Sequence, residues 1–206
     1  MKPWYRFGYI FTTIVSKTFF SFRVVHRERM LETGGAIVAM NHQSFFDPPL
    51  VGICSRRDIY FLARKSLFSW PVLGPIFPKL NNIPVDRDGS DMGALKTLIK
   101  LVRSGQGVAL FPEGTRTRDG NLQTAKAGIG LVIAKTMAPV VPMRIFGAFE
   151  AFPRDRKLPK FHKITIVVGE PVYFTQADIG EGGREVYQKL SDRVMEAIAA
   201  IQYERP

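Results

Sequence analysis

Cysteine and histidine are scarce in this chain. Its 206 residues include one cysteine, Cys54, and three histidines, His26, His42 and His162. A single cysteine excludes an internal disulfide and a cysteine-rich metal site. The histidines lack the short spacing that zinc ligands usually show. We therefore expect neither a metal ion nor a bound cofactor.

Long hydrophobic runs are missing from the N-terminal segment. Its longest uncharged run, residues 7–16, has ten residues, whereas a membrane-spanning helix needs about 20. The segment also lacks the cationic start, apolar core and cleavage site of a signal peptide. Instead, many aromatic side chains lie among Lys2, Arg6 and Lys17, which is typical of a helix at the headgroup boundary of a bilayer. We expect residues 1–33 to form an amphipathic membrane-surface helix; packing on the domain's own core is the alternative.

Acidic residues are few relative to basic ones. The chain has 29 lysines and arginines against 18 aspartates and glutamates, so its formal net charge is +11. This excess predicts acidic partners such as phosphates, anionic lipids or nucleic acid. Nucleic-acid-binding modules usually carry a basic helix or aromatic-studded strands, and the sequence has neither pattern. We expect an anionic membrane surface, and no nucleic acid, as a partner.

The remaining sequence predicts one α/β domain over residues 34–206, without repeats or linkers. Unalternated apolar runs, typical of strands covered on both faces, occur at residues 36–40, 59–63, 83–85, 108–111, 140–145 and 164–168. Helical periodicity occurs at residues 95–102, 129–137 and 186–201, with Ser90 as a candidate N-cap. Alternating strands and helices predict a central, mostly parallel sheet flanked by helices.

A histidine and an aspartate stand five residues apart after the first of these strands. Residues 41–47 read Asn-His-Gln-Ser-Phe-Phe-Asp. A carboxylate bonded to one ring nitrogen of His42 would fix its tautomer and leave the other nitrogen free to take a proton. No serine or cysteine stands out as a nucleophile, so the activated hydroxyl would belong to the substrate. The alternative is structural: Asp47 caps a helix that begins at Pro48.

A candidate phosphate-binding loop follows another predicted strand. Residues 111–120 read Phe-Pro-Glu-Gly-Thr-Arg-Thr-Arg-Asp-Gly, and arginine offers a planar fork that matches phosphate oxygens. Two further cations are Arg87, just past a short extended segment, and Lys126, at the entry to a helix. Ligands bind at the carboxyl ends of strands in open α/β sheets, so these cations predict an anionic substrate beside His42. Taken singly, each is equally explained as a solvated surface residue.

Four motifs resemble those of the glycerolipid acyltransferase family. The family's first motif, Asn-His, four residues and Asp (HxxxxD), matches residues 41–47, and its second, an extended segment that ends in arginine, matches residues 83–87. Its third, Phe-Pro-Glu-Gly-Thr-Arg, matches residues 111–116, and its fourth, an apolar stretch around a proline, matches residues 140–143. All four occur in the family's order, and the resemblance covers about residues 35–170.

This resemblance implies a 1-acyl-sn-glycerol-3-phosphate (lysophosphatidic acid) acyltransferase of phospholipid biosynthesis. The donor would be acyl-CoA or acyl-ACP, an acyl thioester on coenzyme A or acyl carrier protein, and the acceptor lysophosphatidic acid. His42 would be the base, and Asp47 would orient it. The resemblance assigns substrate binding to these residues: Arg87, Glu113, Gly114, Thr115, Arg116 and Lys126. It also implies a peripheral or monotopic protein on the cytoplasmic face of the cell membrane.

Two positions depart from the family pattern and leave alternatives open. Asn81 stands where relatives often carry glycine, and Ala125 where many carry phenylalanine. Acylation of glycerol-3-phosphate or of another lysolipid is therefore an alternative. A non-catalytic basic module that binds membranes or nucleic acid is an alternative of a different class. The proline-broken apolar segment 67–78 fits a wall of the acyl path, a loop that dips into the membrane, or a cover over the core.

Overall fold

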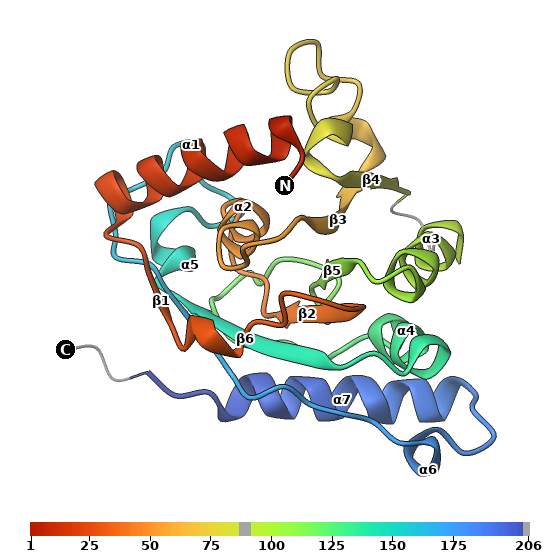
Figure 1. The fold of residues 1–206 in the computed structure, drawn as a ribbon. Helices are drawn as coiled ribbons and strands as arrows, with labels where there is room; N and C mark the ends of the chain where they lie inside the picture. Colours follow the sequence, from red (N-terminus) through yellow and green to blue (C-terminus); the bar gives the residue numbers. More distant parts are fainter. Residues whose placement is uncertain (87–91, 204–206) are drawn as a thin grey trace.

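A twisted sheet of seven strands organises the chain (Figure 1). The computed structural model describes residues 1–86 and 92–203. The strands lie in the order β1-β7-β6-β2-β5-β3-β4. Neighbours are parallel except β6 and β7, which pair antiparallel. The predicted α/β fold with a mostly parallel sheet is confirmed.

Six of the seven strands coincide with the predicted apolar runs to within a residue or two. The strands are β1 (Arg23–Val25), β2 (Ala36–Met40), β3 (Ile59–Arg64), β4 (Asn82–Val85), β5 (Gly107–Leu110), β6 (Val140–Phe146) and β7 (Thr165–Val168). The sequence did not predict β1. It is three residues long and lies at the edge of the sheet beside β7, so it carries almost no periodic pattern.

Helices cover both faces of the sheet (Figure 1). The helices are α1 (Pro3–Phe20), α2 (Asp47–Gly52), α3 (Met92–Arg103), α4 (Gly128–Thr136), α5 (Ala148–Ala151), α6 (Gln176–Ile179) and α7 (Arg184–Ala200). Short 3-10 turns are η1 (Arg27–Arg29), η2 (Lys65–Leu67) and η3 (Pro78–Leu80). Helices α1, α2 and α5 pack on one face, and α3, α4 and α7 on the other. The predicted candidate cap Ser90 lies outside the described residues.

The core is split into two halves by the sheet, and β2 contributes to both. Val38 and Met40 pack under α1 and α2, whereas Ile37 and Ala39 pack under α3, α4 and α7. All five residues of β2 are buried. The uninterrupted apolar run therefore reflects a strand covered on both faces.

Helix α1 is tied to the domain at Tyr5. The buried Tyr5 hydroxyl accepts a hydrogen bond from the Ile59 backbone N–H over 3.2 Å and donates to the Gly52 carbonyl over 3.4 Å. Within residues 1–86 and 92–203, no helix has both the length and the apolar character needed to cross a membrane. The division of the chain between residues 33 and 34 stays a prediction.

The carboxyl ends of the parallel strands meet at one edge of the sheet. The loops after β2 and β5 begin there with Asn41 and Phe111. Strand β3 ends there at Arg64, and β4 at Val85. This is the edge at which open α/β sheets bind ligands. The second predicted motif reaches it through β4, but its terminal Arg87 lies outside the described residues.

Candidate active site

His42 and Asp47 form a close pair in the loop between β2 and α2. Their Nδ1 and Oδ2 atoms are 2.7 Å apart. Asp47 Oδ2 also accepts hydrogen bonds from the backbone N–H groups of Gln43 over 2.6 Å and Ser44 over 2.7 Å. The carboxylate is fully buried. A carboxylate held by three donors fixes His42 in the tautomer that protonates Nδ1, which leaves Nε2 as the acceptor.

The structural alternative for Asp47 is a helix cap, and the geometry differs from it. Asp47 is the first residue of α2, and the start of this helix carries no side-chain cap bond. The carboxylate instead points back to the loop that carries His42. Helix α2 thus positions Asp47 for the histidine, and Pro48 and Pro49 supply a first turn that needs no N–H partners.

The imidazole of His42 is packed as well as hydrogen-bonded. Its ring stacks on Phe111, the first residue after β5, with centroids 4.0 Å apart and planes at 17°. The backbone carbonyl of His42 accepts a hydrogen bond from the Thr117 N–H over 2.8 Å. These contacts join the two loops. The ring therefore has a fixed orientation while its side chain stays 18% exposed.

The loop after β5 folds around a glycine in the left-handed region. Gly114 has φ of +68°, and its N–H donates to the Phe111 carbonyl over 2.9 Å. The Lys126 N–H donates to the Pro112 carbonyl over 2.9 Å. A Cβ on Gly114 would lie 2.9 Å from Lys126 Cδ and 3.2 Å from Nζ. The side chain of Lys126 therefore packs against Gly114, and the absence of a side chain on Gly114 leaves room for it.

Glu113 is buried in this loop and lies against the histidine loop. Burial raises the pKa of Glu113 from 4.5 to about 7, and the charge of Asp47 adds to this. The backbone N–H groups of His42 and Gln123 oppose the shift. The Gln123 side-chain amide also donates to Glu113 Oε2 over 3.2 Å. Glu113 thus connects the loop after β5 to the loop that carries His42.

Arg116 and Thr115 complete the loop. The Arg116 guanidinium lies 3.4 Å above the ring of Phe45, a stacked cation–π arrangement. Arg116 is buried and lines the same cavity as His42. Thr115 is partly exposed in the same turn. Five predicted site residues therefore lie together in the loop after β5: Glu113, Gly114, Thr115, Arg116 and Lys126. Of these, Glu113 accepts a backbone hydrogen bond from His42, and Arg116 lines the cavity that His42 also lines.

A largely apolar cavity of about 450 Å³ opens beside His42. Its walls come from α1, α2, β3 and the segment that follows η2. The lining residues that sequence reasoning missed include Tyr5, Gly8, Tyr9, Thr12, Leu62 and Arg64. The first four are spaced i, i+3, i+4, i+7 on α1, so they form one helix face. Separating this face from the outward aromatic face would have found them. Leu67, Trp70 and Phe77 also line the cavity, so segment 67–78 forms one of its walls.

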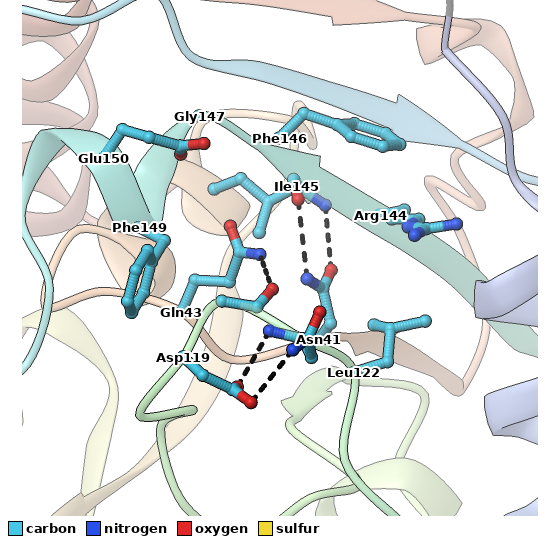
Figure 2. A pocket seen from close by; sticks show the side chains of 12 residues that line it. Asn41, Gln43, Asp119, Leu122, Arg144, Ile145, Phe146, Gly147, Phe149 and Glu150 are labelled. Carbon is cyan, nitrogen blue, oxygen red and sulfur yellow. Dashed lines mark hydrogen bonds between the residues drawn. The ribbon is translucent and has the colours of Figure 1, made fainter.

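A second, polar cavity of about 280 Å³ lies on the other side of the β2 end (Figure 2). There Asn41 pins β2 to β6: its Oδ1 accepts the Ile145 N–H over 2.9 Å, and its Nδ2 donates to the Ile145 carbonyl over 3.4 Å. Gln43 donates to the Gly120 carbonyl over 3.0 Å. Both side chains support the loop that carries His42, which does not line this cavity.

Asn81, one of the two departures from the family pattern, lies in the left-handed region with φ of +58°. Asparagine adopts this conformation more readily than other residues with a side chain. Its buried Oδ1 accepts a hydrogen bond from Lys2 Nζ over 2.9 Å. Asn81 thus adopts a conformation that glycine favours, and its side chain adds a link to the start of the chain.

Comparison with known proteins identifies the family. A model of the family described as Acyltransferase matches residues 21–146. Similar proteins are 1-acyl-sn-glycerol-3-phosphate acyltransferases from Brassica napus (chloroplastic BAT2; 32% identity, 69% of this chain, 42% of the relative) and Bacillus subtilis (30% identity, 76% of this chain, 75% of the relative). The chain thus spans less than half of the plant relative's length and three quarters of the bacterial one's.

A solved structure agrees with these relatives. The crystal structure of the 1-acyl-sn-glycerophosphate (LPA) acyltransferase, PlsC, from Thermotoga maritima superposes with a TM-score of 0.73 and 26% identity, over 98% of this chain and 81% of that one. The matched family model includes all the residues that surround His42 in the loops after β2 and β5. This chain therefore belongs to the acyltransferase family.

Proposed function

We propose that this protein transfers a fatty acyl group from acyl-CoA or acyl-ACP to the free hydroxyl of lysophosphatidic acid, which gives phosphatidic acid. The observation that carries the proposal is the orientation of His42. Asp47 binds its Nδ1, and its ring lines the apolar cavity that Arg116 also lines. A base, a cation for a phosphate and room for an acyl chain meet at this point.

The chemistry needs one proton transfer in each direction. His42 Nε2 takes the proton of the acceptor hydroxyl while the oxygen attacks the thioester carbonyl. The C–S bond then breaks, and the proton on His42 passes to the leaving thiolate. Asp47 stabilises the imidazolium that forms in between. General-base help of this kind contributes roughly 10²- to 10⁴-fold in rate.

Binding energy would supply much of the remaining acceleration. Holding two lipidic substrates in attack geometry replaces a bimolecular encounter by a step within one complex. We assign the acceptor phosphate to Arg116, which lines the cavity with His42, and to Lys126, whose side chain lies against Gly114. Arg87 belongs to the same proposal by its motif. An acyl chain fits the apolar cavity between α1 and β3.

We also propose that α1 rests on the cytoplasmic face of a membrane, where anionic lipids gather. Its outward row of large apolar side chains comprises Trp4, Phe7, Ile10, Phe11 and Ile14, each between 47% and 66% exposed. Val72 and Leu73 in the segment after η2 are exposed as well. Moving such rings and aliphatic chains from water to the acyl boundary of a bilayer lowers their free energy. A lipid acceptor would then reach His42 without leaving the bilayer.

An acceptor panel tests the reaction. Purified protein is given lysophosphatidic acid, glycerol-3-phosphate or a zwitterionic lysolipid, each with acyl-CoA and with acyl-ACP, and thiol release is measured. We expect the highest kcat/KM with lysophosphatidic acid. Preference for glycerol-3-phosphate would assign a different acceptor, and absence of thiol release with every pair would contradict an acyltransferase reaction.

A further inference from the structure

The segment between α5 and β7 concentrates positive charge that the active site does not use. Residues 153–163, called the basic loop below, contain five lysines and arginines and one aspartate, a net charge of +4. Like charges at this density repel one another and do not stabilise a fold. Among the described residues, no carboxylate forms an ion pair with Lys157, Lys160 or Lys163. These side chains are exposed.

The basic loop also exposes two large apolar side chains. Leu158 is 75% exposed and Phe161 is 79% exposed. Hydrogen bonds hold the loop in place at its base: the Lys160 N–H donates to the Ala151 carbonyl over 2.7 Å, and Arg156 Nη1 donates to the Glu150 carbonyl over 3.0 Å. The exposed apolar residues therefore belong to an anchored loop.

The loop is continuous with the outward face of α1. The Phe161 ring stacks on Phe19, near the end of that helix, with centroids 5.7 Å apart and planes at 18°. Phe19 is itself 50% exposed. In Figure 1 the chain after α5 runs along α1. The apolar side chains of the loop and of the helix thus form one surface, with lysines around its edge.

We propose that the basic loop is a second membrane anchor, which binds anionic lipid headgroups beside the C-terminal end of α1. This rests on the proposed function, in which α1 lies on the surface of a bilayer. Lysines between exposed apolar residues match an interface in which the cations meet phosphates and the apolar groups enter the acyl boundary. An acidic protein would satisfy the lysines but not the exposed Phe161 and Leu158.

Vesicle binding of the full chain tests this. The charge variant replaces three lysines of the basic loop: Lys157→Gln, Lys160→Gln and Lys163→Gln. Binding is measured by sedimentation with phosphatidylcholine vesicles and with vesicles of phosphatidylcholine and phosphatidylglycerol in equal parts. Each lysine near an anionic surface contributes about a fivefold change in affinity, so three correspond to roughly 100-fold. We expect that loss with anionic vesicles at low salt, and unchanged binding to neutral ones.

A matched control removes the same charge from the opposite face of the sheet. It carries Lys96→Gln, Lys100→Gln and Lys135→Gln, all exposed on α3 and α4. We expect it to bind anionic vesicles nearly as wild type does. Equal losses in the two variants would show that only net charge matters and would overturn the proposal. Wild-type binding by the loop variant would overturn it as well.

Two further measurements test membrane binding by α1 and the acyl-transfer reaction separately from the basic loop. Phe7→Gln with Phe11→Gln should weaken binding to both kinds of vesicle. An unchanged affinity for neutral vesicles would contradict the proposal that α1 binds the membrane surface. Thiol release with lysophosphatidic acid in detergent micelles should be unchanged in the loop variant. A loop variant that binds vesicles normally but uses acyl-ACP poorly would assign the loop to the acidic carrier protein instead.

Discussion

Replacing Asp47 by asparagine isolates the charge behind His42 while keeping its shape. The amide oxygen of asparagine can occupy the position of Oδ2 and accept the same three hydrogen bonds, from His42 and from the Gln43 and Ser44 N–H groups. With the amide flipped, its NH₂ group would face these three N–H donors, and no hydrogen bond could form. The amide nitrogen must therefore take the position of Oδ1, which is buried and has no hydrogen-bond partner among the described residues.

The magnitude has two parts, one for folding and one for catalysis. A buried amide N–H group without a partner costs about 1–3 kcal/mol of folding stability. In the transition state the imidazolium loses the attraction of a carboxylate whose charge centre is about 4 Å away, which is about 4 kcal/mol at an effective dielectric constant near 20. Since about 1.4 kcal/mol is tenfold in rate, we expect kcat/KM to fall about 10³-fold in Asp47→Asn.

Thiol release with lysophosphatidic acid measures the rate, and urea unfolding measures the stability. The KM for both substrates should change little, because Asp47 is buried and touches neither. A folded Asp47→Asn protein with less than a tenfold loss in kcat/KM would show that the carboxylate charge does not stabilise the imidazolium. A variant that unfolds in buffer would show instead that the three hydrogen bonds need the carboxylate charge.

The remaining predictions concern Arg116 and Glu113. Arg116→Lys keeps the charge but loses the planar fork and the stacking on Phe45, so the KM for lysophosphatidic acid should rise about tenfold, while the donor KM stays constant; an unchanged acceptor KM would count against a phosphate-binding role. Burial raises the pKa of Glu113 from 4.5 to about 7, so the folded state holds the proton longer than the unfolded chain and stability is lost as pH rises from about 4.5 to about 7. Glu113→Gln should therefore gain about 1–3 kcal/mol relative to wild type across that pH range in urea unfolding, with no further gain above it; parallel pH dependence of the two proteins would contradict the shift.

The parts of the fold that were predictable from sequence are those with strong local patterns. Strand β2 is buried along its whole length, so its apolar run is unmistakable. Helix α3 keeps Leu98 and Val102 on one buried face, which the periodicity marks directly. Strand β1 has three residues, and its position follows from pairing with β7, about 140 residues further along the chain. No local pattern encodes such a partner.

The candidate site divides in the same way. The five-residue spacing of His42 and Asp47 fits a single loop, so the predicted contact needs no long-range information. The approach of Lys126 to Gly114 depends on a hydrogen bond from the Lys126 N–H to the Pro112 carbonyl. The motif at residues 111–116 does not predict this hydrogen bond. The apolar cavity is made by side chains from α1, α2, β3 and the segment after η2. Its walls become neighbours only when the sheet has formed.

In the proposed reaction His42 removes the proton from the acceptor hydroxyl, so substitution of His42 should stop acyl transfer. His42→Ala is compared with His26→Asn, a control at an exposed histidine whose left-handed φ asparagine tolerates. We predict that thiol release with lysophosphatidic acid falls at least about 10²-fold in His42→Ala and is unchanged in His26→Asn, with both proteins folded. Equal activity of the two variants would show that His42 is not the base.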